Sequence, residues 1–295
     1  MKRMALTIGV GLLGLMLLSS AVWAGHGKKG EEGKRAILLA AFGTTIPEAQ
    51  KALDQVEQRV RQEFPGVEVR WAYTSGMVRK KLASEGKTLE SPEMALARLM
   101  DDGFTHVAVL SLHTIPGREF HELAQNARLF GQMSDGFRKV SVAWPLLSSR
   151  EDHVRVAKAM IRQIPSGRKP QDAVVLMGHG SEHHPSDAIY SAMNLAFHEL
   201  DPNIHVATVD GYPQLEDILP RLEAAKTRKV YLMPFMAVAG DHARNDMSGD
   251  EPDSWKSVLK AKGFDCDIVL KGTAENAEIV DVWLDHLKTA MRQLD

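Results

Sequence analysis

The feature that most constrains the fold is a regular alternation of short apolar runs with longer segments of helical period, beginning at residue 35. The runs are rich in β-branched residues and predict strands at 36–42, 67–73, 106–112, 139–144, 173–178, 204–209, 229–235 and 266–270. The segments between them predict helices at 47–63, 92–102, 118–131, 151–163, 186–200, 213–226, 252–262 and 275–292. Such β–α alternation favours an α/β fold with parallel sheets covered by helices on both faces.

Helix-start signals support two of these boundaries. Pro47 and Pro92 fit the first turn of a helix, where the missing N–H has no partner to lose. Ser91 precedes Pro92 as a candidate cap, and Thr44 or Thr45 is the corresponding candidate before Pro47.

The two halves of the chain repeat each other faintly. Segment 38–45 leads from apolar residues into a Gly-containing loop, as does 175–182, and 109–120 and 231–242 form a second such pair. This echo predicts two similar Rossmann-like domains, 35–165 and 166–295, joined at the linker-like 165–172. The alternative is one eight-stranded domain. The last predicted helix, 275–292, can pack back on the first domain.

The first 24 residues have the composition of a secretory signal peptide. A basic start, Lys2-Arg3, precedes an apolar run and a small-x-small cleavage pattern that ends at Ala24. The alternative is an uncleaved anchor, but the run is short for a span of about 20 residues. We therefore expect export to the periplasm, a mobile leader at 25–34, and no stable membrane span after cleavage.

Charge and cysteine content exclude several classes of protein. The chain has 36 Lys and Arg against 38 Asp and Glu, and cleavage removes two of the basic residues. This balance argues against a nucleic-acid binder, which shows a basic excess. The single cysteine, Cys266, allows no internal disulfide and is expected to be a buried, inert thiol.

Polar side chains follow three of the predicted strands in the second half. His179 lies between two glycines after the fifth strand, Asp210 follows the sixth, and His242 lies beyond the seventh. Parallel α/β sheets bind ligands at the carboxyl ends of their strands. Two imidazoles and a carboxylate without a thiolate suit Co²⁺, Fe²⁺, Ni²⁺ or Zn²⁺. The alternative for Asp210 is a cap of the helix that starts near Pro213.

Other histidines are assigned supporting positions. His183 and His184 follow His179 closely and are expected to line the cleft. His121 lies in the third predicted helix, 118–131, and is either an exposed helical histidine or an extra metal or haem ligand. P-loop and nucleophile-elbow motifs are absent from the sequence, and G-x-G-x-x-G occurs only at 9–14 and 25–30, before the first predicted strand, where it cannot be a dinucleotide fingerprint.

Taken together, several segments resemble one family, the anaerobic cobalt chelatases of the CbiK type, which are class II tetrapyrrole chelatases. They are 73-YTSGMVRKKL-82, 110-LSLHTIPGREF-120, 145-PLLSS-149, 177-MGHGSEHH-184, 212-YP-213, 232-LMPFMAVAGDHARNDM-247 and 254-SWK-256. The resemblance implies a ferrochelatase-like fold with a cleft between two domains. It also implies ATP-independent insertion of Co²⁺ into sirohydrochlorin, with His179 and His242 matching the family's metal-site histidines. The family often carries Glu where this sequence has the shorter Asp210.

The implied reaction assigns roles to these residues. Metallation removes two pyrrole protons, and a neutral histidine can hold the ion and then accept a proton. We expect His179 to be the base and Asp210 to orient a histidine or accept the second proton. Arg79 and Arg118 are the candidate partners, with His183 and His184, of the substrate's carboxylates. The alternative for 79-RKK-81 is a solvated helix face.

The signal peptide departs from the family, whose members act in the cytoplasm. It leaves open whether the physiological metal is Co²⁺ or Fe²⁺. It also supports an alternative function, a periplasmic carrier of metal or tetrapyrrole that retains the chelatase fold. Haem bound through His121 at a subunit contact would make the protein a homo-oligomer.

Overall fold

The computed structural model describes residues 33–181 and 184–295, and residues 33–295 belong to one unit. The predicted signal peptide, most of the predicted leader, and His183 lie outside the described residues. Within the described part of the chain, no helix is both long enough and apolar enough to cross a membrane.

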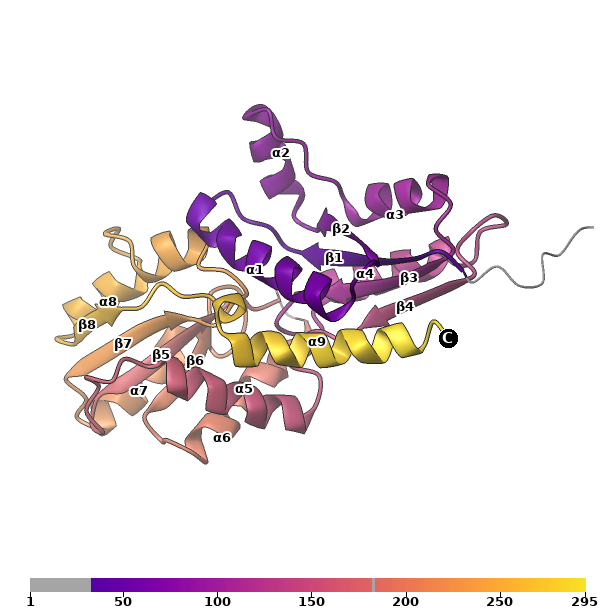
Figure 1. Cartoon of the computed structure of the whole chain (residues 1–295). Helices are drawn as coiled ribbons and strands as arrows, with labels where there is room; N and C mark the ends of the chain where they lie inside the picture. Colours follow the sequence, from indigo (N-terminus) through magenta and orange to yellow (C-terminus); the bar gives the residue numbers. More distant parts are fainter. Residues whose placement is uncertain (1–32, 182–183) are drawn as a thin grey trace, which may run out of the picture. The chain divides into compact units, whose positions relative to one another are not determined.

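The described strands form two four-stranded parallel sheets, which confirms the predicted fold class (Figure 1). The first sheet has the order β2-β1-β3-β4 and contains β1 (Arg35–Ala41), β2 (Glu68–Tyr73), β3 (His106–Ser111) and β4 (Lys139–Ala143). The second has the matching order β6-β5-β7-β8 and contains β5 (Ala173–Gly178), β6 (Ile204–Thr208), β7 (Lys229–Pro234) and β8 (Asp265–Ile268). The change of sheet falls between β4 and β5, where the linker was predicted.

The principal helices occupy the predicted segments, with bounds that differ by a few residues. They are α1 (Pro47–Glu63), α3 (Pro92–Asp101), α4 (Arg118–Phe130), α5 (Arg150–Gln163), α6 (Ala188–His198), α7 (Leu215–Ala224), α8 (Trp255–Ala261) and α9 (Ala277–Arg292). Ser91 caps α3 as expected, accepting from the backbone N–H of Met94. The cap predicted for α1 is wrong, because Ile46 is the N-cap residue and Thr44 instead accepts from the N–H of Ile46.

Four short elements were not predicted. They are α2 (Gly76–Ser84), the 3-10 helices η1 (Pro185–Asp187) and η3 (Thr273–Glu275), and the π-helix η2 (Ala243–Met247). In α2 only Val78 and Leu82 are buried, so the apolar stripe is too short to stand out in the sequence. Its start is fixed locally by Ser75, whose side chain accepts from the N–H of Val78.

Successive side chains of each central strand point to opposite faces and enter different cores. In β1, Ile37 and Leu39 pack in one apolar cluster with residues of α1 and α9, whereas Leu38 packs in another with residues of α3 and α4. In β5, Leu176 shares the first cluster with residues of α6, and Val175 packs with residues of α7 and α8. Both sheets are therefore covered on both faces.

One apolar cluster is shared by the two sheets. It contains Ile37 and Leu39 of β1 together with Leu176 of β5, and it includes the fully buried Trp283 and Leu287 of α9. α9 follows β8 in the chain, yet it contacts β3 and β4 of the first sheet as well as α5 (Figure 1). Burial of one leucine side chain contributes about 2 kcal/mol, so α9 holds strongly to the first sheet.

Candidate metal centre

The structure brings together the three residues that the sequence singled out. His179 follows β5, Asp210 follows β6 and His242 lies beyond β7. Each offers one ligand atom, and these atoms all lie within 4.8 Å of one another. His179 and His242 are half-buried, whereas Asp210 is exposed. This donor set fits a borderline divalent ion, and the assignment of individual roles stays a prediction.

The glycines on either side of His179 allow close packing of the backbone. Gly180 has a φ of +93°, and a Cβ there would lie 2.6 Å from the carbonyl carbon of Asp210. A Cβ on Gly178 would lie 2.5 Å from the ring of Tyr190. The backbone N–H of Asp210 donates to the carbonyl of His179 over 2.7 Å. The Gly-His-Gly motif therefore places the loops after β5 and β6 side by side.

Asp210 is not the cap of α7. That helix begins at Leu215 with Gln214 as its N-cap residue, and the N–H of Gln214 donates to Asp217 over 2.8 Å. The capping alternative is therefore wrong, which leaves the carboxylate of Asp210 on the exposed side of the centre.

Both imidazoles have an acceptor at Nδ1. In His179 this atom lies 3.1 Å from the carbonyl oxygen of Gly180, and in His242 it lies 2.6 Å from Oδ2 of Asp246. A carbonyl and a carboxylate only accept, so each Nδ1 carries a proton. The Nε2 lone pair of each ring is then free to bind an ion. The two rings meet edge to face.

Loops of the first half reach the same place. The ring of Phe42, directly after β1, has its centroid 5.7 Å from that of His179. Thr45 donates to Asp241, the residue before His242, over 3.1 Å, and Lys81 of α2 lies 3.3 Å from the Thr45 hydroxyl. The carboxyl ends of both sheets therefore contribute to the surroundings of the centre.

The two predicted arginine anchors have structural contacts of their own. Arg79 donates from Nη1 to the carbonyls of Tyr73 and Thr74, at the end of β2. The backbone N–H of Arg118 donates to the hydroxyl of Ser181 over 3.2 Å, which places the start of α4 beside the loop after β5. Their contact with substrate stays a prediction.

His121 and His184 lie beside each other, a proximity that the sequence did not reveal. Their ring centroids are 5.4 Å apart, with His121 exposed on α4. His184 caps η1, because its Nδ1 accepts from the N–H of Ser186 over 3.2 Å. The neutral ring of His184 therefore carries its proton on Nε2, which makes it a poorer ligand than His121.

Asp246 and His113 both follow predicted strands, but neither was assigned a role from the sequence. Asp246 lies four residues after His242, a spacing that could have indicated the pair. His113 follows β3, with Nδ1 2.8 Å from the hydroxyl of Ser111 and Nε2 3.2 Å from that of Thr74. Burial lowers the pKa of His113 to about 4, although Glu119 opposes the shift. His113 is therefore neutral at physiological pH. Cys266 is half-buried in β8 rather than buried as predicted, and burial raises its pKa to about 11, as expected for an inert thiol.

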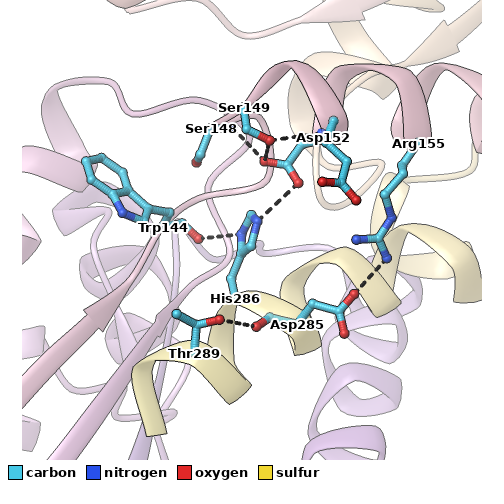
Figure 2. Close-up of a pocket in the computed structure, with 9 residues that line it drawn as sticks. Trp144, Ser148, Ser149, Asp152, Arg155, Asp285, His286 and Thr289 are labelled. Carbon is cyan, nitrogen blue, oxygen red and sulfur yellow. Dashed lines mark hydrogen bonds and ion pairs between the residues drawn. The ribbon is translucent and has the colours of Figure 1, made fainter. Parts of the chain in front are cut away.

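A cavity of about 550 Å³ lies elsewhere, between the β4–α5 connection, α5 and α9 (Figure 2). His286 spans it, with Nδ1 3.0 Å from the carbonyl of Trp144 and Nε2 3.2 Å from Oδ1 of Asp152. Arg155 pairs with Asp285 over 2.8 Å. These polar groups satisfy one another, so we assign the cavity to the packing of α9 against α5.

The comparison with known proteins gives consistent results. The family model for cobalt chelatase (CbiK) matches residues 35–292. Sirohydrochlorin cobaltochelatase CbiKC of Nitratidesulfovibrio vulgaris (strain Hildenborough) is 44% identical over 262 residues, which cover 89% of this chain and 92% of the relative. Sirohydrochlorin cobaltochelatase of Salmonella typhimurium is 34% identical, with coverage of 88% and 97%.

Solved structures support the fold alone. SirB from Bacillus subtilis with Fe³⁺ has a TM-score of 0.57 at 18% identity and covers 89% of this chain and 99% of its own. CbiX, described as the terminal enzyme of sirohaem biosynthesis in denitrifying bacteria, has a TM-score of 0.52 at 15% identity, with coverage of 87% and 99%. With the family model spanning nearly all of the described residues and two relatives above 30% identity, the chain belongs to the CbiK family of cobalt chelatases.

Proposed function

We propose that the protein inserts Co²⁺ into sirohydrochlorin at the centre formed by His179, Asp210 and His242. The observation that carries this proposal is the convergence of their three ligand atoms within 4.8 Å. The proposal is further supported by the names of two relatives that match over most of their length. The protein is then a metal chelatase of the lyase class.

The ion is held by the two Nε2 atoms and approaches the macrocycle from one side. Asp210 is the exposed member of the centre, so we place the macrocycle on its side. Imidazole and carboxylate accept Co²⁺ and Fe²⁺ alike. Iron is therefore an additional substrate in this proposal, and the ligand set does not rank the two metals.

Metallation exchanges two pyrrole protons for one divalent ion, so two protons leave for each metal that enters. His179 takes one of them, because its Nε2 lies where the ion is released to the ring. Asp210 takes the second or orients a histidine. The sequence contains no P-loop, in keeping with insertion that does not use ATP.

The substrate's carboxylates need cations near the centre despite the acidic total charge. Lys81 is connected to the centre through Thr45 and Asp241, and Arg118 begins α4 beside the loop after β5. These two are the better-placed anchors. Arg79 is bound to backbone carbonyls at the end of β2 and serves as a weaker one.

We further propose that the protein acts in the periplasm after cleavage behind Ala24. The support is the basic start, apolar run and small-x-small pattern of the first 24 residues. Intact mass of the protein from a periplasmic extract tests this. A mass that begins at Gly25 supports cleavage there, and a full-length mass in the membrane fraction contradicts it.

We also propose that His121 binds haem as an axial ligand. An exposed imidazole on a helix suits axial ligation only where another surface covers the rest of the haem. This part therefore requires a homo-oligomer with α4 at a subunit contact. A haem absorbance band that is lost in His121→Ala would support it, and an unchanged band would contradict it.

The test of the main proposal is an anaerobic absorbance time course with sirohydrochlorin and Co²⁺ or Fe²⁺. Fast spectral change that disappears in His179→Ala supports the chelatase and ranks the metals. The carrier alternative predicts binding spectra with no acceleration over the reaction without protein. That second result would overturn the enzymatic proposal.

A further inference from the structure

His242 and Asp246 are paired on the π-helix η2. Nδ1 of His242 lies 2.6 Å from Oδ2 of Asp246, which is short for a nitrogen–oxygen contact and typical of a charge-assisted hydrogen bond. The side chains are 36% and 47% exposed, so the pair lies at the rim of the centre. No part of the proposed reaction yet uses Asp246.

The backbone around this pair is firmly held. Ala243 and Met247 are fully buried and anchor η2 to the core of the second sheet. Ser248 donates to the carbonyl of Ala243 over 2.8 Å and to that of Arg244 over 3.2 Å. Such π-turns are rare and occur often at functional sites. The widened turn therefore presents Asp246 to His242 on a rigid support.

The two histidines of the centre differ in what supports them. The partner of His179 is a backbone carbonyl at 3.1 Å, whereas the partner of His242 is an anionic side chain at 2.6 Å. A carboxylate that accepts from Nδ1 fixes the tautomer and the ring plane, and it makes Nε2 a stronger donor to a metal. A backbone carbonyl fixes the tautomer and the ring plane more weakly.

We propose that Asp246 is a positioning residue of the metal centre. It holds His242 in the Nδ1–H tautomer with Nε2 directed at the ion, and thereby sets the affinity for the substrate metal. This inference rests on the proposed function, because it takes His242 to be a metal ligand.

The chain offers a matched control in Asp241. This residue is also exposed and lies next to His242, but its carboxylate accepts from Thr45. Asp241→Asn and Asp246→Asn each remove one negative charge, on either side of His242 in the sequence. Asp246→Leu keeps the branching at Cγ, with two methyl groups in place of the carboxylate oxygens, and removes the acceptor, while the amide oxygen of Asp246→Asn can still accept from Nδ1.

The experiment is an anaerobic Co²⁺ titration of the purified protein without tetrapyrrole, followed by ligand-field absorbance. We expect Asp246→Leu to weaken Co²⁺ binding by about 10- to 100-fold, Asp246→Asn to fall between it and the parent protein, and Asp241→Asn to bind as the parent does. In turnover with sirohydrochlorin, KM for Co²⁺ should rise in Asp246→Leu while kcat at saturating metal stays nearly unchanged.

A second measurement does not depend on how well the variants bind. Nitrogen-15 NMR of the metal-free protein reports the tautomer of His242, which should be Nδ1–H in the parent and a mixture in Asp246→Leu. Parent-like Co²⁺ affinity or an unchanged tautomer in that variant would overturn the inference. His242→Ala is tested alongside: if it binds Co²⁺ as the parent does, the proposed centre itself fails.

Discussion

The imidazole rings of His179 and His242 meet edge to face, with centroids 4.8 Å apart and planes at 88°. They follow β5 and β7, which are neighbours in the second sheet, and Asp210 follows β6 on the other side of β5. One sheet therefore supplies the whole candidate ligand set. The segment after β1 of the first sheet contributes two neighbouring residues: Phe42, beside the ring of His179, and Thr45, which donates to Asp241.

This proximity predicts strongly non-additive effects of replacing the two histidines. His179→Ala and His242→Ala should each slow cobalt insertion by about 100-fold or more, and the double variant should be little worse, because either loss already breaks the site. Initial rates with Co²⁺ and sirohydrochlorin measure this. His198→Ala is the control, since that ring pairs with His205 away from the centre. Equal losses in the control would indicate a general effect on folding.

Asp210 should tolerate lengthening better than loss of charge. Asp210→Asn removes an anionic acceptor for the second proton and should slow insertion by about tenfold or more. Asp210→Glu keeps the charge and extends the reach by one methylene on an exposed side, so most activity should remain. The measurement is the rate as a function of Co²⁺ concentration. Parent-like kinetics in Asp210→Asn would remove this residue from the mechanism.

Gly180→Ala should damage both stability and metal binding. An alanine in the left-handed region costs roughly 1–2 kcal/mol, and at Gly180 its Cβ would also meet the backbone of Asp210 at 2.6 Å. Gly263 has a similar φ of +87° but no atom within 4 Å of an added Cβ. Gly263→Ala should therefore lose only the conformational part. Thermal unfolding and Co²⁺ titration compare the two, and equal losses would show that the contact with Asp210 is unimportant.

The sequence was sufficient where a single physical rule decides the outcome. Alternating β and α segments predicted the strands of both sheets. Because parallel sheets bind ligands at the carboxyl ends of their strands, the same pattern indicated His179, Asp210 and His242, which the structure brings together. Asp246 follows the seventh predicted strand, but its contact with His242 depends on the π-helix η2, which the sequence did not predict. The contact of Thr45 with Asp241 joins residues 196 positions apart, which no local pattern encodes.

Two predicted site residues also form contacts that the sequence did not reveal. Nδ1 of His184 caps η1, and the expected place of this residue in the cleft wall stays a prediction. Part of the guanidinium of Arg79 is occupied by carbonyls at the end of β2, which a pattern of basic residues cannot show. A polar side chain can thus form a hydrogen bond with a nearby unpaired backbone group, and only the structure shows which group it contacts.

The pair of Asp152 and His286 predicts how stability depends on pH. Burial alone would raise the pKa of Asp152, but hydrogen bonds from His286 and Ser149 outweigh burial and lower it. A carboxyl group whose pKa is lowered by folding stabilises the protein above its unfolded pKa of about 3.9. That contribution is lost as the pH falls through the lower folded pKa.

Asp152→Asn should therefore reduce the free energy of unfolding by about 1–3 kcal/mol at pH 7, because His286 loses a charged partner in a buried place. Urea denaturation between pH 7 and pH 3 should show the difference from the parent shrinking as the pH falls below about 4, because the carboxylate of the unfolded chain then binds a proton while that of the folded parent is still ionised. The control is Asp285→Asn, which breaks a half-exposed pair with Arg155 and should cost less than about 1 kcal/mol. A difference that stays constant down to pH 3 would contradict the ionic role.

The pair joins α5 to α9, and α9 brings Trp283 into the core that the two sheets share. Acid should therefore weaken the contact of α9 with α5 while leaving the apolar contacts of α9 with the first sheet unchanged.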